Sequence, residues 1–60
     1  MTPRYLTVQE AAEYLGTTVT ALRKRVERGD IPYIKDGRRL RFDRHDLDSH
    51  MRAQRVEASA

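Results

Sequence analysis

The basic side chains of this 60-residue chain are concentrated in its central third. Eight lysines and arginines and three acidic residues lie between Thr20 and Arg41, a local charge of +5, whereas the remaining residues carry four cations and six acidic groups, a charge of −2. The eight cations are Arg23, Lys24, Arg25, Arg28, Lys35, Arg38, Arg39 and Arg41. The planar guanidinium group pairs with phosphate oxygens in a bidentate manner, so a cluster of this kind favours a polyanionic partner.

Other chemistry has weaker support. The chain has no cysteine, hence no thiol nucleophile and no disulfide. His45 and His50 lie near three aspartates, but residues five apart on a helix are separated by about 140° of rotation, which is a poor arrangement for metal ligands. No pattern suggests a catalytic triad. We therefore expect no enzyme, no metal site and no cofactor.

Two short helices are predicted in the first half of the chain. Thr7 and Glu10 form a capping-box pattern, apolar residues recur at helical spacing, and Gly16 stands where a left-handed residue would end the helix. A second N-cap at Thr17–Thr18 precedes a helix that carries one apolar stripe and is predicted to end at Gly29. The stripe consists of Val19, Leu22 and Val26. Two such helices joined by a short glycine-containing turn are typical of a helix-turn-helix.

The second half predicts a β-hairpin followed by a helix. Pro32 prevents helix continuation, and two strands, 33–35 and 38–42, are joined by an Asp36-Gly37 turn. Because side chains alternate along a strand, Leu40 and Phe42 are predicted to face the core and Arg39 and Arg41 to face outward. Together with Lys35 and Arg38, they are predicted to form one outward basic cluster on the hairpin. A third helix is predicted after Asp43, with Leu47 and Met51 closing the core.

These elements predict an α+β, mostly α, winged helix-turn-helix with two short helices, a two-stranded wing and a C-terminal helix. The domain is predicted to span residues 1–53, with a disordered tail at 54–60. No run of residues has the length and apolarity of a membrane span or a signal peptide, so we expect a cytoplasmic protein that does not contact a membrane.

The second helix presents small polar and basic residues opposite its apolar stripe. Small residues allow a helix to approach base edges in the major groove, and lysine or arginine can bind guanine or phosphate. Arginines of the hairpin can enter a narrow minor groove or pair with the backbone. We therefore predict that the chain binds double-stranded DNA. The predicted helix contacts are Thr17, Thr18, Thr20, Ala21, Arg23, Lys24, Glu27 and Arg28, and the predicted wing contacts are Lys35, Arg38, Arg39 and Arg41.

The order of these segments resembles the excisionase-type, MerR-like winged helix family. The resemblance is carried by residues 6–16, 20–24, 29–32 and 35–42 and covers about Tyr5 to Met51. It implies that the second helix enters the major groove while the wing contacts the neighbouring minor groove. By position it points to Thr20, Arg23, Lys24 and Glu27 on the helix and to Lys35, Arg38 and Arg39 on the wing.

Small members of that family resemble phage or mobile-element excisionases, also called recombination directionality factors. The resemblance implies side-by-side binding of several copies near an attachment site, DNA bending and assistance to an integrase. It also implies a nucleoid-associated location in a bacterial host cell. The same module resembles small phage transcription regulators, which bind promoter DNA and remain an alternative. A third interpretation is a protein-interaction module with an acidic partner, which the wing disfavours. MerR-type regulators add a long dimerisation helix and an effector domain, so we expect no small-molecule effector here.

Overall fold

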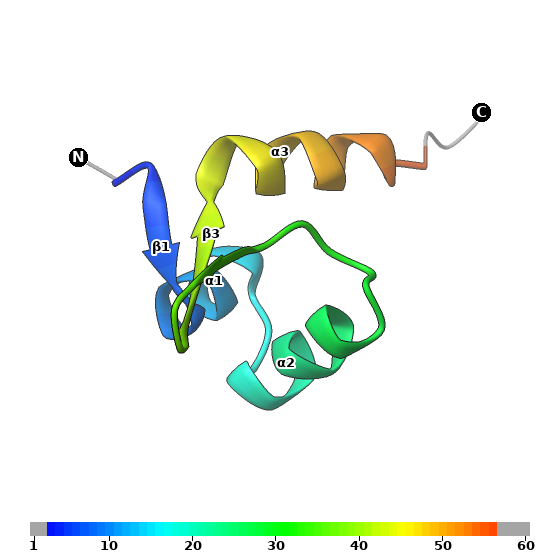
Figure 1. Cartoon of the computed structure of the whole chain (residues 1–60). Coiled ribbons are helices and arrows are strands. Elements are labelled where there is room, and N and C mark those ends of the chain that lie inside the picture. The colour runs from blue at the N-terminus through cyan, green and yellow to red at the C-terminus, as the bar shows by residue number, and fades with distance from the viewer. Residues whose placement is uncertain (1–2, 57–60) are drawn as a thin grey trace.

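The computed structural model describes residues 3–56, which form three helices and three short strands (Figure 1). In chain order the elements are β1 (Tyr5–Thr7), α1 (Val8–Leu15), α2 (Val19–Glu27), β2 (Ile34–Asp36), β3 (Arg39–Asp43) and α3 (Arg44–Ala53). The strands form one antiparallel sheet in the order β1-β3-β2. The predicted winged helix-turn-helix is confirmed. None of the helices over residues 3–56 has the length and hydropathy of a membrane span.

Local capping interactions define the two helices of the helix-turn-helix. The Thr7 hydroxyl accepts a hydrogen bond from the Glu10 amide at 3.1 Å, and the Glu10 carboxylate accepts one from the Thr7 amide at 3.0 Å, as predicted. Gly16 ends α1 with a left-handed φ of 71°, and Thr18 then caps α2 by accepting from the Ala21 amide at 3.1 Å. The turn between the helices is therefore only Gly16–Thr18.

Replacing Thr18 with alanine should destabilise the protein measurably. The hydroxyl satisfies one of the amides at the start of α2, and loss of such a cap costs about 1 kcal/mol. In a domain of this size that free energy lowers the melting temperature by about 4–8 °C, which thermal unfolding followed by circular dichroism would detect. Thr18→Ser keeps the hydroxyl and is the matched control. Equal melting temperatures for Thr18→Ala and Thr18→Ser would contradict the capping role.

The core lies where α1, α2 and α3 meet the inner face of the sheet. Phe42, Leu22 and Leu47 have the largest fully buried side chains. Ala11 and Ala12 are also buried, and their small side chains let α2 approach α1 closely. The complete buried apolar set is Leu6, Ala11, Ala12, Leu22, Ile31, Phe42 and Leu47, with Val8, Leu15, Val19, Val26 and Leu40 packed partly buried against it.

The prediction that Met51 closes the core is wrong. Its side chain remains 43% exposed, although Leu47, one turn earlier, is fully buried. The C-terminal half of α3 extends past the end of the sheet (Figure 1), so a residue one turn beyond Leu47 no longer lies above the core. α3 ends at Ala53, and residues 57–60 of the predicted disordered tail lie outside the described residues.

The hairpin turn lies one residue later than predicted. Asp36 pairs with Arg39, so the two turn residues are Gly37 and Arg38 instead of Asp36 and Gly37. Of these two turn residues only Gly37 has a positive φ, 62°, which is the pattern of a type II′ turn with glycine first. Lys35 therefore pairs with Leu40 and shares its side of the sheet, which corrects the prediction that Lys35 faces outward with Arg39 and Arg41.

The third strand, β1, was not predicted. Its central residue, Leu6, pairs with Phe42 and is buried with it, and Thr7 pairs with Arg41. The strand is held at its start by an ion pair of 3.3 Å between Arg4 and Asp43. Burial raises the pKa of Asp43, but hydrogen bonds from the His45 amide and the Arg4 guanidinium outweigh that effect and hold the pKa below its ordinary value. The pairing fixes the start of α1 beside the wing.

Candidate nucleic-acid interface

The polar face of α2 is presented to solvent, as the apolar stripe predicted. Leu22 is fully buried, and Val19 and Val26 pack against the core on the same side. On the other side Thr18, Thr20, Arg23, Lys24, Glu27 and Arg28 are exposed, while Thr17 and Ala21 are half-buried. The eight residues predicted for helix contacts therefore lie along one accessible surface from the turn to the end of α2.

Two arginines of this segment are paired within the protein. Arg25 is half-buried, with its guanidinium 3.8 Å from the Asp30 carboxylate and 3.4 Å from Nε2 of His50 on α3. Arg28 lies 3.9 Å from the same Asp30 carboxylate. Arg25 thus links α2 to α3 and lies away from the exposed face. Within residues 3–56 no group of three or more histidine, cysteine or acidic side chains is close enough to hold a metal ion.

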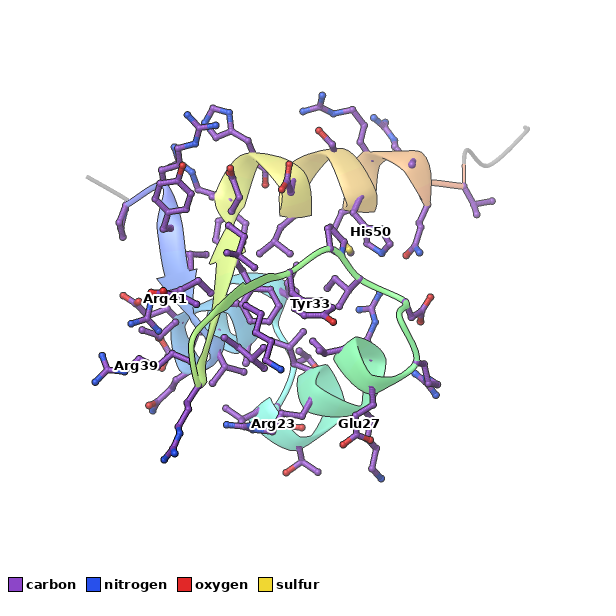
Figure 2. The ribbon with its side chains drawn as sticks, in the orientation of Figure 1. Arg23, Glu27, Tyr33, Arg39, Arg41 and His50 are labelled. Atoms are coloured by element: carbon purple, nitrogen blue, oxygen red, sulfur yellow. The ribbon has the colours of Figure 1, made fainter. Side chains whose placement is uncertain are left out.

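The wing carries its arginines at the turn and along β3. Arg38 lies in the turn, Arg39 is exposed, and Arg41 is half-buried. Figure 2 shows Arg39 and Arg41 projecting from the same side of β3, and Arg23, in the middle of α2, lines the same hollow as these two residues. Lys35 is exposed on the opposite side of the hairpin from Arg39 and Arg41.

A groove of about 220 Å³ joins the two basic elements. Its lining comes from α2, the wing and the junction of β1 with α1, and it consists of Thr7, Val8, Arg23, Arg38, Arg39, Leu40 and Arg41. The structure thus brings together four of the twelve predicted contact residues, Arg23 with three wing arginines. Lys24, Glu27 and Arg28, which follow Arg23 toward the C-terminal end of α2, do not line the groove.

Thr7 and Val8 were not predicted to lie at this surface. The sequence assigned them only to the start of the first helix, and their position beside Arg41 depends on the pairing of β1 with β3. Glu10 lies at the edge of the same region. Hydrogen bonds from the Thr7 amide and hydroxyl, together with the positive charge of Arg41, lower the pKa of Glu10 below its ordinary value.

An exposed second helix braced by the first, with a basic hairpin beside it, defines a helix-turn-helix protein that binds DNA in a sequence-specific manner. Residues 5–55 match the model of the helix-turn-helix domain family, and the chain belongs to that family. Comparison with curated proteins and with solved structures gave no significant match.

Proposed function

We propose that this protein is an excisionase, an accessory factor that binds attachment-site DNA, bends it and directs an integrase toward excision of a phage or mobile element. The observation that carries the proposal is the groove joining α2 to the wing, because it makes one continuous basic surface from two elements that can enter adjacent grooves of a duplex. Of the segments that resemble the excisionase-type family, residues 20–24 lie on α2 and residues 35–42 form the wing. The role is architectural and requires no catalysis and no cofactor.

In this proposal α2 binds in the major groove. Thr20 and Ala21 lie in its first turn, where small side chains allow the backbone to approach base edges. Lys24, one turn later and exposed, reaches a guanine acceptor. Arg38 and Arg39 at the tip of the wing enter the adjacent minor groove, where their charge is attracted to the negative potential of the narrow groove.

A single copy would bind weakly because its contact surface is small. Single DNA-binding modules bury about 600–1,000 Å² of protein surface, which is the low end of specific interfaces. Binding of several copies to adjacent sites adds neighbour contacts to each weak affinity and raises occupancy. We therefore propose that several copies occupy one attachment site and bend it together.

The proposal is tested by a gel-shift titration with excess competitor DNA at about 150 mM salt, where screening is close to physiological. One duplex is the attachment site of the element that carries the gene, and the other is the promoter beside that gene. A ladder of complexes confined to attachment-site DNA is expected. Preference for promoter DNA would favour the transcriptional regulator instead, and equal loss of both complexes to competitor would contradict both functions.

Replacing Glu27 with glutamine should relax sequence discrimination. Glu27 is exposed among the cations of α2. Because the helix dipole disfavours a carboxylate in the last turn of a helix, Glu27 does not stabilise α2, and a contact with the bound duplex explains its presence better. A carboxylate accepts a hydrogen bond from cytosine N4 and repels phosphate. Glu27→Gln should bind random-sequence duplex more tightly, by about two- to fivefold, and discriminate less by about 1–3 kcal/mol at one base pair.

The matched control is Glu13→Gln, which removes the same charge from an exposed position on α1 outside the basic groove. Fluorescence anisotropy with a specific and a random-sequence duplex measures both affinities. Identical changes for Glu27→Gln and Glu13→Gln on the two duplexes would show that Glu27 contributes only net charge.

A further inference from the structure

The four arginines around the basic groove differ from Arg4, Arg25 and Arg28 in having no carboxylate partner among the described residues. Arg4 pairs with Asp43 at 3.3 Å, and Arg25 and Arg28 lie 3.8 and 3.9 Å from Asp30. Over residues 3–56 no carboxylate lies within 4.0 Å of the side-chain nitrogens of the groove arginines, which are Arg23, Arg38, Arg39 and Arg41. Four cations around one hollow repel each other, and a bound anion relieves that repulsion.

Arg41 is the most constrained of the four. It is half-buried, and its guanidinium donates a hydrogen bond of 3.1 Å to the Leu40 carbonyl. The arginines at positions 23, 38 and 39 are exposed. A guanidinium that is already held in place loses less side-chain entropy when it binds a ligand, so Arg41 provides a fixed point in the groove.

The start of α1 contributes the wall of the groove and not the charge. The Thr7 amide and hydroxyl are both engaged with Glu10, at 3.0 and 3.1 Å. Val8 and Leu40 add apolar surface beside them. An anion in this groove is therefore bound by guanidinium groups, while the apolar side chains suit the deoxyribose carbons on either side of a phosphodiester.

We infer that the groove between α2 and the wing seats one phosphodiester of the DNA strand that separates the major groove from the minor groove, with Arg41 and Arg23 on its two sides. The inference rests on the proposed placement of α2 and the wing in adjacent grooves, because the strand between those grooves then passes over the hollow that joins the two elements. The contact fixes the orientation of the protein on the duplex and carries no base preference.

The test is the salt dependence of binding to a random-sequence duplex, since phosphate contacts do not depend on sequence. The slope of log Kd against log salt concentration is measured by fluorescence anisotropy for the wild type, Arg41→Gln and Arg23→Gln. Arg52→Gln is the control, since Arg52 is exposed on α3 and lines a different hollow. Each groove variant should lower the slope by about 0.9, the value for one lost phosphate contact, and Arg52→Gln should leave it unchanged.

A wild-type slope in either groove variant overturns the inference. A slope that Arg52→Gln lowers as much as the groove variants do also overturns it. Arg23 is exposed on a helix surface, so Arg23→Gln keeps the test valid even where Arg41→Gln disturbs the sheet. Because the duplex has no attachment site, the slopes do not depend on the outcome of the gel shift, and failure of the excisionase proposal is distinguishable from failure of the phosphate seat.

A titration of the wild-type protein with inorganic phosphate separates a free anion from a DNA phosphodiester. Amide chemical shifts are followed by two-dimensional NMR, and changes concentrated at residues 7, 8, 23 and 38–41 are expected. If phosphate causes these shift changes but both groove variants keep the wild-type salt slope, the groove binds free phosphate and not a DNA phosphodiester. That result would overturn the inference.

Discussion

Phe42→Ala should abolish the folded state at physiological temperature. Phe42 is fully buried, pairs with Leu6 across the sheet and lies at the centre of the only apolar cluster over residues 3–56. Truncation of a buried phenylalanine costs about 3–5 kcal/mol. A domain of 60 residues has a total stability of roughly 3–9 kcal/mol at typical values per residue, so the loss is comparable to the whole.

Circular dichroism at 222 nm and a DNA-binding titration measure the two consequences, loss of helix and loss of binding. The matched control is Val56→Ala, which truncates another apolar side chain, one that is 90% exposed, and should change the stability by no more than about 0.5 kcal/mol. A melting temperature for Phe42→Ala close to that of Val56→Ala would contradict the assignment of the core.

Raising the salt concentration from 50 to 200 mM should weaken binding to any duplex by about a thousandfold. The α2 face and the wing offer enough exposed cations for about six phosphate contacts, and each contact releases bound counterions from the duplex, so the affinity falls steeply with salt. Fluorescence anisotropy over this salt range measures the slope directly. A decrease of less than tenfold would show that the basic surface does not bind the phosphate backbone.

The features that were predicted correctly from sequence depend on neighbouring residues. The capping box of Thr7 with Glu10, the left-handed Gly16 and the caps at Thr18 and Asp43 each involve groups within three residues of each other. The exposed face of α2 also follows from a local property, the helical spacing of its apolar stripe. These local signals were sufficient to define the helix-turn-helix.

The errors arise where distant segments decide the structure. β1 has only three residues, too few for a periodic pattern, and is stabilised by its pairing with β3. The turn of the wing moved by one residue because pairing of Asp36 with Arg39 leaves Gly37 as the first turn residue. Lys35 lies on the Leu40 side of the sheet with either turn, because moving the turn by one residue changes each cross-strand partner by two, so the error was to group Lys35 with Arg39 and Arg41. The exposure of Met51 depends on where the sheet ends beneath α3, which spacing along a helix does not reveal.

The candidate site shows the same difference between local features, which the sequence predicts, and features that depend on distant segments. The cations of α2 and of the wing were predicted as two separate clusters, and the structure joins four of them around one groove. Thr7 and Val8 enter that groove only through the register of β1 against β3, with Thr7 opposite Arg41. A phosphate-binding role for this groove therefore required the arrangement in space.

The central claim is that α2 recognises bases while the wing binds the duplex through its charge without base preference, and a comparison of Lys24→Ala with Arg38→Ala tests it most directly. Both side chains are exposed, and both variants remove one positive charge. Affinities for a specific and a random-sequence duplex are measured at several salt concentrations. Lys24→Ala should weaken specific binding by about 1–3 kcal/mol more than random-sequence binding, whereas Arg38→Ala should weaken both equally and lower the salt slope by about 0.9. Titration curves of both variants that coincide with the wild type on both duplexes would contradict the claim.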